Sequence, residues 1–237
     1  MIAKLLLGAG DYFLENPLGV VVQTIRNVGV RMTLNRLLAL GMVLCFMAFQ
    51  PAAAATKTSP EEAEKFIRAL GDEAVKLLSD KSIPLTDREA KIRELLRRNF
   101  DLETIGRFVL SKYWRTASPD QQSEYLALFS EFVLKTYARR LGGYANEQFK
   151  INSAKPLGER DAVVLTEISR QAGPPITAGW RVRDTNSSYR IIDVMVEGVS
   201  MAAAQRSEFE TIVRNQGLVG LIEILRAKVS GFSARPS

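Results

Sequence analysis

The chain has 237 residues, a net charge of +6, one Cys and no His. Without His, the side chain most often used as a general base near neutral pH is missing, and Ser-His and Cys-His nucleophile pairs are excluded. A zinc site would need carboxylate ligands alone, which is unusual for that metal. Basic residues are dispersed among acidic ones, which argues against a nucleic-acid-binding protein. The composition therefore favours a protein with no catalytic residue, no metal and no cofactor.

Paired carboxylates are the remaining route to acid–base chemistry. The nearest candidates are Asp161 with Glu167 and Asp193 with Glu197. Asp and Glu at such spacings occur in most soluble proteins, so we interpret these four as solvated strand and loop carboxylates. An exported, carboxylate-dependent hydrolase stays open as the alternative.

The N-terminal region contains the pattern of a secretory signal. Arg31 and Arg36 precede an apolar run over residues 37–49, and small residues ending in an A-x-A pattern follow at 51–55. The run is shorter than the roughly 20 residues that a membrane span needs. We expect a signal peptide over 32–55 and a mature domain over 56–237. An anchor that is not cleaved is the alternative.

Residues 1–31 do not fit a signal peptide, because Asp11, Glu15 and Pro17 interrupt them. Met32 would start a signal of ordinary length. We expect translation to begin there, with a genuine N-terminal extension as the alternative. The sequence of the exported protein's first residues would decide between the two.

Four helices are predicted before residue 143, because apolar residues recur at spacings of three and four. The first is expected to end near residue 78, the second near 99 and the fourth at Gly142. Side chains that accept hydrogen bonds from free backbone N–H groups commonly begin helices. The expected caps of this kind are Ser59, Thr86, Asp101 and Ser118.

From residue 149 the apolar period changes to two, which indicates strands over 163–168, 176–183 and 189–197, with a weaker one over 149–153. In the last strand, Ile192, Val194 and Val196 are expected to share a buried face. Ser200 then caps a helix that Gly217 ends, and a second amphipathic helix spans 218–228. Short connections imply an antiparallel meander. The predicted fold class is α+β, with a curved antiparallel sheet of about four strands and helices packed on one face.

Three motifs follow one another in the C-terminal part: D-V-x-x-E-G-V-S over 193–200, R-S-x-F over 206–209 and G-x-x-x-L-I-x-x-L over 217–225. They resemble the MlaC family, also called toluene-tolerance proteins. Upstream, Phe100-Asp101, Tyr113-Trp114 and the F-x-x-F…T-Y series over 129–137 are similar to the same family. The resemblance covers roughly residues 66–228.

The resemblance implies a periplasmic carrier that is not an enzyme. Such a carrier shields the two acyl chains of a phospholipid in an apolar cavity and moves the lipid between an inner-membrane ABC transporter complex and an outer-membrane lipoprotein complex, which maintains the lipid asymmetry of the outer membrane. Some relatives belong to hopanoid systems, so a hopanoid or other lipid is an alternative cargo. Two exposed acyl chains would cost on the order of 20 kcal/mol in water, which an apolar cavity must offset.

Nine side chains are expected to line the cavity and contact lipid. They are Phe108, Phe129, Val133, Tyr137, Trp180, Ile192, Val194, Phe209 and Val213. For each of them the alternative is ordinary core packing, because a filled core and a lined cavity give the same sequence pattern. A module that scaffolds other envelope proteins is a third hypothesis, and it would need no cavity.

Overall fold

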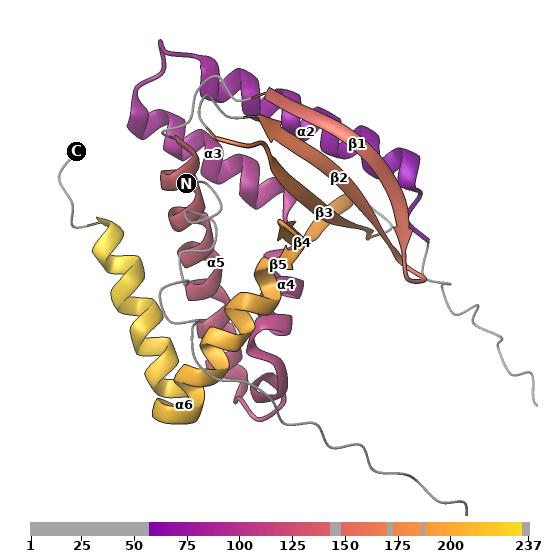
Figure 1. Ribbon diagram of the computed structural model, residues 1–237. Helices are drawn as coiled ribbons and strands as arrows, with labels where there is room; N and C mark the ends of the chain where they lie inside the picture. The colour runs from indigo at the N-terminus through magenta and orange to yellow at the C-terminus, as the bar shows by residue number, and fades with distance from the viewer. Residues whose placement is uncertain (1–56, 143–147, 170–172, 186–187, 234–237) are drawn as a thin grey trace, which may run out of the picture. The chain divides into compact units, whose positions relative to one another are not determined.

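The computed structural model describes residues 57–142, 148–169, 173–185 and 188–233 (Figure 1). The expected extension over 1–31 and the expected signal peptide over 32–55 lie outside the described residues. The elements in chain order are α2 (Pro60–Ser79), α3 (Leu85–Asn99), α4 (Leu102–Leu110), the 3-10 helix η2 (Ser111–Arg115), α5 (Pro119–Gly142), β1 (Gln148–Leu157), β2 (Asp161–Ser169), β3 (Ile176–Asp184), β4 (Tyr189–Val196), β5 (Val199–Ser200) and α6 (Met201–Ser233).

Three of the four predicted caps before residue 143 are confirmed. The Ser59 hydroxyl accepts from the Glu62 N–H at 3.4 Å, and the Asp101 carboxylate accepts from the Thr104 N–H at 2.9 Å. Ser118 accepts from the Gln121 N–H at 3.2 Å, while the Gln121 side chain accepts in return from the Ser118 N–H at 3.1 Å. This reciprocal pair satisfies two backbone donors that a helix start leaves open.

The predicted cap at Thr86 is wrong. Helix α3 begins at Leu85, directly after Pro84, and Thr86 is already its second residue. Pro84 occupies the cap position without a side-chain hydrogen bond, and its φ of −53° leads the chain into the helix. Asp87 in the first turn faces the positive end of the helix dipole.

The sheet is fully antiparallel, with strand order β1-β2-β3-β4-β5, and its long strands curve in Figure 1. The predicted meander is confirmed. It carries one further short strand, β5, and its first strand is longer than expected, reaching Leu157. Irregularities in the register occur between Ile151 and Ser153 and opposite Arg181 and Val182. Both increase local twist and bend the sheet.

The second irregularity changes which residues of β4 face the helices. Val182 pairs with Ile191 and Trp180 pairs with Val194, so Ile192 is the extra residue of a bulge. The expectation that Ile192 shares a face with Val194 stays a prediction. Ile191, which is fully buried, belongs to the core that Val164 and Val182 form with α2. Strict alternation fails here because two residues of β4 oppose one step of β3.

Helices cover the inner face of the sheet. Ala63 and Ile67 of α2 pack against Val164, Val182 and Ile191 of the strands. A second core lies among α4, α5 and α6, where the Phe129 ring stands 5.7 Å from Tyr125 and 6.3 Å from Phe209, centroid to centroid. A third, smaller cluster joins Ile92 and Leu95 of α3 to Ala138 of α5.

Helix α6 is two helices joined at Gly217, whose φ of 72° and ψ of 175° interrupt the spiral. Figure 1 shows the two arms as a V beside α5. The predicted helix end at Gly217 is confirmed, and the second arm continues to Ser233. None of the helices in the described ranges combines the length and hydropathy that a bilayer crossing requires.

Candidate functional site: an apolar cavity between the sheet and the helices

A cavity of about 290 Å³ lies between the inner face of the sheet and the helices. Among the elements that the structure describes, every helix except η2 contributes to its wall, and so do the first four strands. Nearly all of the side chains that line it are apolar. Helix α2 supplies Ile67, Leu70, Gly71, Ala74, Val75 and Leu78; α3 supplies Ile92, Leu95 and Leu96; α4 supplies Leu102, Ile105 and Val109.

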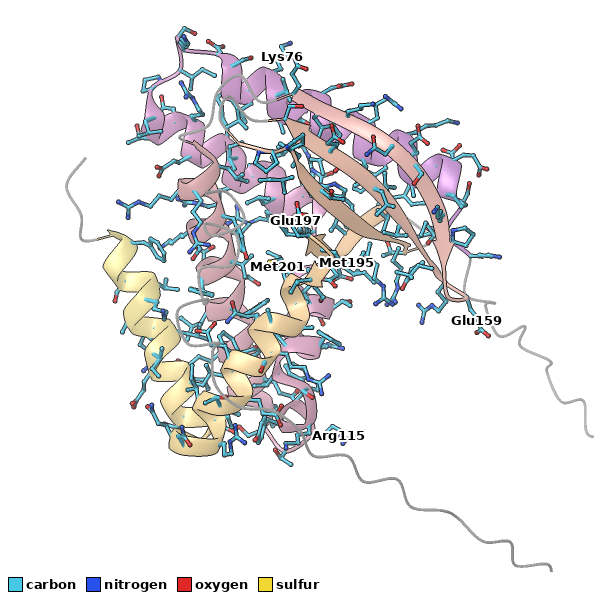
Figure 2. All side chains as sticks on the ribbon, in the orientation of Figure 1. Lys76, Arg115, Glu159, Met195, Glu197 and Met201 are labelled. Atoms are coloured by element: carbon cyan, nitrogen blue, oxygen red, sulfur yellow. The ribbon has the colours of Figure 1, made fainter. Side chains whose placement is uncertain are left out.

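The sheet closes the other side of the cavity. Phe149 and Ile168 contribute from β1 and β2, Ala178 and Trp180 from β3, and Val194 and Val196 from β4. The start of α6 adds Met201 and Ala202. Figure 2 shows Met201 beside Met195 and Glu197, at the junction where β4 and β5 lead into α6.

Five of the nine predicted lining residues are brought together around this cavity. Phe129, Val133 and Tyr137 come from successive turns of α5, and Trp180 and Val194 are neighbours across β3 and β4. Their contact with lipid stays a prediction. The α5 set follows from the helical spacing of four, which places these three side chains on one face.

The other four predicted residues do not line the cavity. Phe209 and Val213 are buried in the core among α4, α5 and α6. Phe108 points outward: its side chain is 45% exposed and the Arg206 guanidinium lies 5.5 Å from its ring centroid. Ile192 is the bulge residue of β4. In each case the sequence shows the apolar character of the side chain but not the side that it faces.

The wall supplied by α2 was not predicted, although its apolar stripe is visible in the sequence. Gly71 is the most telling of these residues, because a Cβ there would lie 2.5 Å from Cε1 of Phe149. The aromatic ring thus packs directly on the α2 backbone. Nothing in the sequence pairs residue 71 with residue 149, so only the tertiary contact could have found it.

Four polar side chains reach the cavity wall: Arg140, Gln148, Asp193 and Gln205. Gln148 is exposed, and Arg140 and Gln205 are half-buried, so these three mark the side on which the cavity meets solvent. The Arg140 guanidinium lies 5.9 Å from the Tyr137 ring centroid. Burial raises the pKa of Tyr137 above its ordinary value, and the Arg140 charge only partly counteracts this.

The carboxylates that could have served a hydrolase are engaged elsewhere. Asp193 accepts from the Ser200 hydroxyl at 2.6 Å and the Ala202 N–H at 3.1 Å, so it holds the start of α6. Glu197 accepts from the Thr177 N–H at 2.7 Å. These three hydrogen bonds stabilise the corner between the sheet and α6. They leave neither carboxylate aimed at a shared substrate position.

Asp161 and Glu167 lie on the outer face of β2, away from the cavity. Six residues along a strand place them about 20 Å apart, too far to share a proton. Asp161 accepts from Arg181 Nε at 2.7 Å and from Arg183 Nε at 2.6 Å. Burial alone would raise the pKa of Asp161, but the hydrogen bonds from Arg183 and Arg181 outweigh it and hold that pKa below its ordinary value.

A second, larger depression of about 540 Å³ surrounds the start of α4. Arg97, Asp101, Glu103, Glu131 and Arg190 line much of it. Charged groups of both signs make it unsuited to hydrocarbon, because burying them against an apolar ligand costs their hydration. Within the residues that the structure describes, no group of three or more potential metal-ligating side chains is found. The narrow apolar cavity is therefore the better candidate site.

The family model described as MlaC protein matches residues 64–227, which is well over half of the chain. This chain belongs to the MlaC family. Among its relatives is the protein named intermembrane phospholipid transport system binding protein MlaC from Haemophilus influenzae, which is 27% identical over 143 residues, 59% of this chain and 67% of that protein. The toluene tolerance protein ttg2D of Pseudomonas putida is 21% identical over 179 residues, 75% of this chain and 83% of that protein.

A solved structure shares the fold of this MlaC family member. It is a phospholipid-binding protein from Ralstonia solanacearum in complex with a phospholipid, with a TM-score of 0.64 and 17% sequence identity. The match covers 72% of this chain and 98% of that one. At such low identity the likeness establishes the α+β fold, not the ligand.

The motifs that carry the MlaC resemblance mostly serve the corner between the sheet and α6. Ser200 accepts from the Ala203 N–H at 3.0 Å and donates to Asp193, and Glu197 ties β4 to β3. Gly217 permits the turn between the arms of α6. These residues position the cavity wall at Met201 and Ala202 without contributing chemistry of their own.

Proposed function

We propose that this chain is a periplasmic phospholipid carrier that shields acyl chains in its cavity during transfer between the two membranes. The observation that carries the proposal is the hydrocarbon wall between the sheet and α2, α3, α4 and α5. Each methylene that leaves water contributes about 0.8 kcal/mol. A cavity with this lining therefore suits an acyl chain and disfavours a charged substrate.

The lipid head group stays at the side of the cavity where Arg140, Gln148 and Gln205 meet solvent. The tails extend inward past Tyr137 and Phe149 toward Trp180. This orientation keeps the charged phosphate hydrated and gives it a nearby cation, so neither end of the lipid loses its preferred environment.

The cavity volume constrains how loading occurs. About 290 Å³ is near the lower limit of ordinary ligand sites, which range over about 300–1,000 Å³. Two acyl chains of ordinary length occupy more than this, so full loading requires the walls of the cavity to move apart.

The partners of this cycle are an inner-membrane ABC transporter complex and an outer-membrane lipoprotein complex. The names of the relatives support such a transport system, and the fold neighbour holds a phospholipid. The carrier catalyses no reaction. The relative hold of each partner on the lipid sets the direction of transfer.

The test is to recover the exported protein, extract it with organic solvent and identify the extracted lipids by mass spectrometry. Near-stoichiometric phospholipid is the expected result. If the extract contains a hopanoid and no phospholipid, the hopanoid is the cargo. Protein that carries no lipid and takes none up from phospholipid vesicles would contradict the proposal. Turnover of an added ester that disappears on Asp193→Asn would instead establish the hydrolase.

A further inference from the structure

The cavity occupies only part of the inner face of the sheet. Paired residues on this face form rows that run across the strands. The row Phe149–Ile168 and the row Ala178–Val196 both supply lining residues. The next row joins Ala154, Val164, Trp180 and Val194, and only Trp180 and Val194 of these line the cavity.

Beyond that row the layer is solid. The following row joins Pro156, Ala162, Val182 and Ile191, and none of the four lines the cavity. Ala162, Val182 and Ile191 have no exposed surface, and they pack with Ala63 of α2.

Helix α2 shows the same boundary. Its lining residues begin at Ile67 and continue to Leu78, whereas Ala63, one turn earlier, and Phe66, directly before Ile67, belong to the packed core. On the sheet and on α2 the lining therefore ends at the level of Trp180 and Ile67, whereas Phe100, which pairs with Ile191, lines the cavity from the connection between α3 and α4.

Trp180 is fixed in this position by a buried polar contact. Its indole N–H donates to Oγ1 of Thr166 at 2.9 Å, and the Thr166 hydroxyl donates onward to the Ala178 carbonyl at 3.2 Å. Thr166 is fully buried. A rotation of the indole would leave its N–H without a partner in an apolar layer, which is costly. The Trp180 ring is therefore a rigid wall.

Phe149, the aromatic neighbour of Trp180, is not anchored by a hydrogen bond. The Phe149 ring meets Trp180 edge-on at 6.3 Å between centroids and rests on Gly71. Phe149 has no polar atom to anchor it. A lipid tail that enters the cavity can displace this ring but meets a fixed indole at the inner end.

We propose that Trp180, held by Thr166, is the end stop of the cavity and sets the longest acyl chain that the carrier accepts. The inference rests on the proposed lipid-carrier function and adds a specificity determinant to it. A chain longer than the distance to the indole leaves methylenes in water at the other end. Each such methylene lowers the relative affinity about fourfold.

The experiment loads delipidated, exported protein from vesicles that contain equal amounts of phosphatidylglycerol with two 14-carbon, two 16-carbon or two 18-carbon saturated chains. Mass spectrometry then gives the bound ratio of 18-carbon to 14-carbon lipid. Trp180→Leu removes the stop and should raise this ratio at least about fourfold. Val194→Phe adds bulk beside the stop and should lower the ratio.

Val219→Ala is the control, because Val219 is exposed on the second arm of α6 and does not line the cavity. Its ratio should equal that of the wild type. Trp180→Phe serves as a milder variant if Trp180→Leu does not fold, and circular dichroism reports folding. An unchanged ratio in folded Trp180 and Val194 variants that bind lipid overturns the end stop alone. Wild-type protein that takes up no lipid overturns the carrier function and the end stop with it.

Discussion

Gly71 and Phe149 touch so closely that no other residue fits at position 71 without movement. A Cβ built there lies 2.5 Å from Cε1 and 2.6 Å from Cδ1 of the ring. This contact joins the middle of α2 to the start of β1, and it forms part of the cavity wall. Helix α2 thereby approaches the sheet more closely than a side chain would allow.

Gly71→Ala should reduce lipid binding. Ala is favoured over Gly in a helix by about 1 kcal/mol, but the new methyl group forces the Phe149 ring aside at a cost of about 1–3 kcal/mol. The displaced ring moves into the cavity and competes with lipid. Lipid occupancy measured by mass spectrometry should fall, and the added Phe149→Leu substitution should restore it. Occupancy that stays low in the double variant would show that Phe149 is not responsible.

Val133→Trp should block the cavity while leaving the protein folded. Val133 lines the cavity from α5, so the larger ring fills space that lipid would use. We expect at least about a tenfold loss of affinity, equal to about 1.4 kcal/mol. The control is Ala127→Trp, at an exposed position of the same helix. Equal occupancy in both variants would remove Val133 from the site.

Asp161→Asn should lower stability without affecting lipid binding. Its side chain is 3% exposed and pairs with Arg181 and Arg183, whose side chains are 39% and 22% exposed. Removal of one partner from a fully buried pair costs about 3–5 kcal/mol, but water reaches both guanidinium groups here, so we expect about 1–3 kcal/mol. Urea unfolding measures the loss. Reduced lipid occupancy in folded protein would contradict the placement of Asp161 on the outer face.

The Asp161 contribution should depend on pH in a defined direction. Its pKa lies below the ordinary 3.8 in the folded protein, chiefly because hydrogen bonds from Arg183 and Arg181 outweigh the opposing effect of burial. Above pH 3.8 the carboxylate is charged in both states and its contribution is complete. As the pH falls below 3.8, the unfolded chain takes up the proton first, and the contribution decreases until the folded pKa is passed.

The measurement is the difference in free energy of unfolding between the wild type and Asp161→Asn, taken at pH 7 and at pH 3. The difference cancels the titration of other carboxylates. It should be smaller at pH 3. A difference that grows on acidification would mean that burial, not the two guanidinium groups, determines the pKa.

Gly217→Ala should destabilise the second arm of α6. The φ of 72° and ψ of 175° fall in a region that is essentially restricted to glycine, at a cost of about 1–3 kcal/mol for other residues. Among the described residues, none beyond the local helix backbone comes within 4 Å of a Cβ placed at this position, so the cost is purely conformational. Gly231→Ala, also in open space within α6, is the control and should be neutral or slightly stabilising. Thermal unfolding compares the two variants.

Local rules made the element boundaries predictable. Ser59, Asp101, Ser118 and Ser200 each accept a backbone hydrogen bond at the start of a helix, as their sequence context indicates. Thr86 carries a similar context but lies after Pro84, whose backbone geometry starts the helix two residues earlier than a cap at Thr86 would. The exception arises because two helix-start signals, the Thr86 side chain and the Pro84 backbone, lie two residues apart.

The direction of apolar side chains was less predictable. Phe108 and Phe129 are both apolar residues on predicted helices, yet one lies outside under Arg206 and the other lines the cavity. Ile192 follows the period of its strand but is the extra residue of a bulge, and the adjacent Ile191 packs in the core, which the period did not indicate. Helical or strand period identifies an apolar face, whereas the neighbour that covers it depends on residues distant in sequence.

The sequence alone determined the α+β class, the order of helices and strands, the helix end at Gly217 and the resemblance to the MlaC family, because these depend on spacing and on short motifs. The cavity whose wall includes Gly71, Phe149 and Trp180, by contrast, follows from tertiary packing. A cavity is a deficit of packing among residues from several elements. Apolar periodicity reports that a side chain leaves water, but not whether another side chain fills the space in front of it.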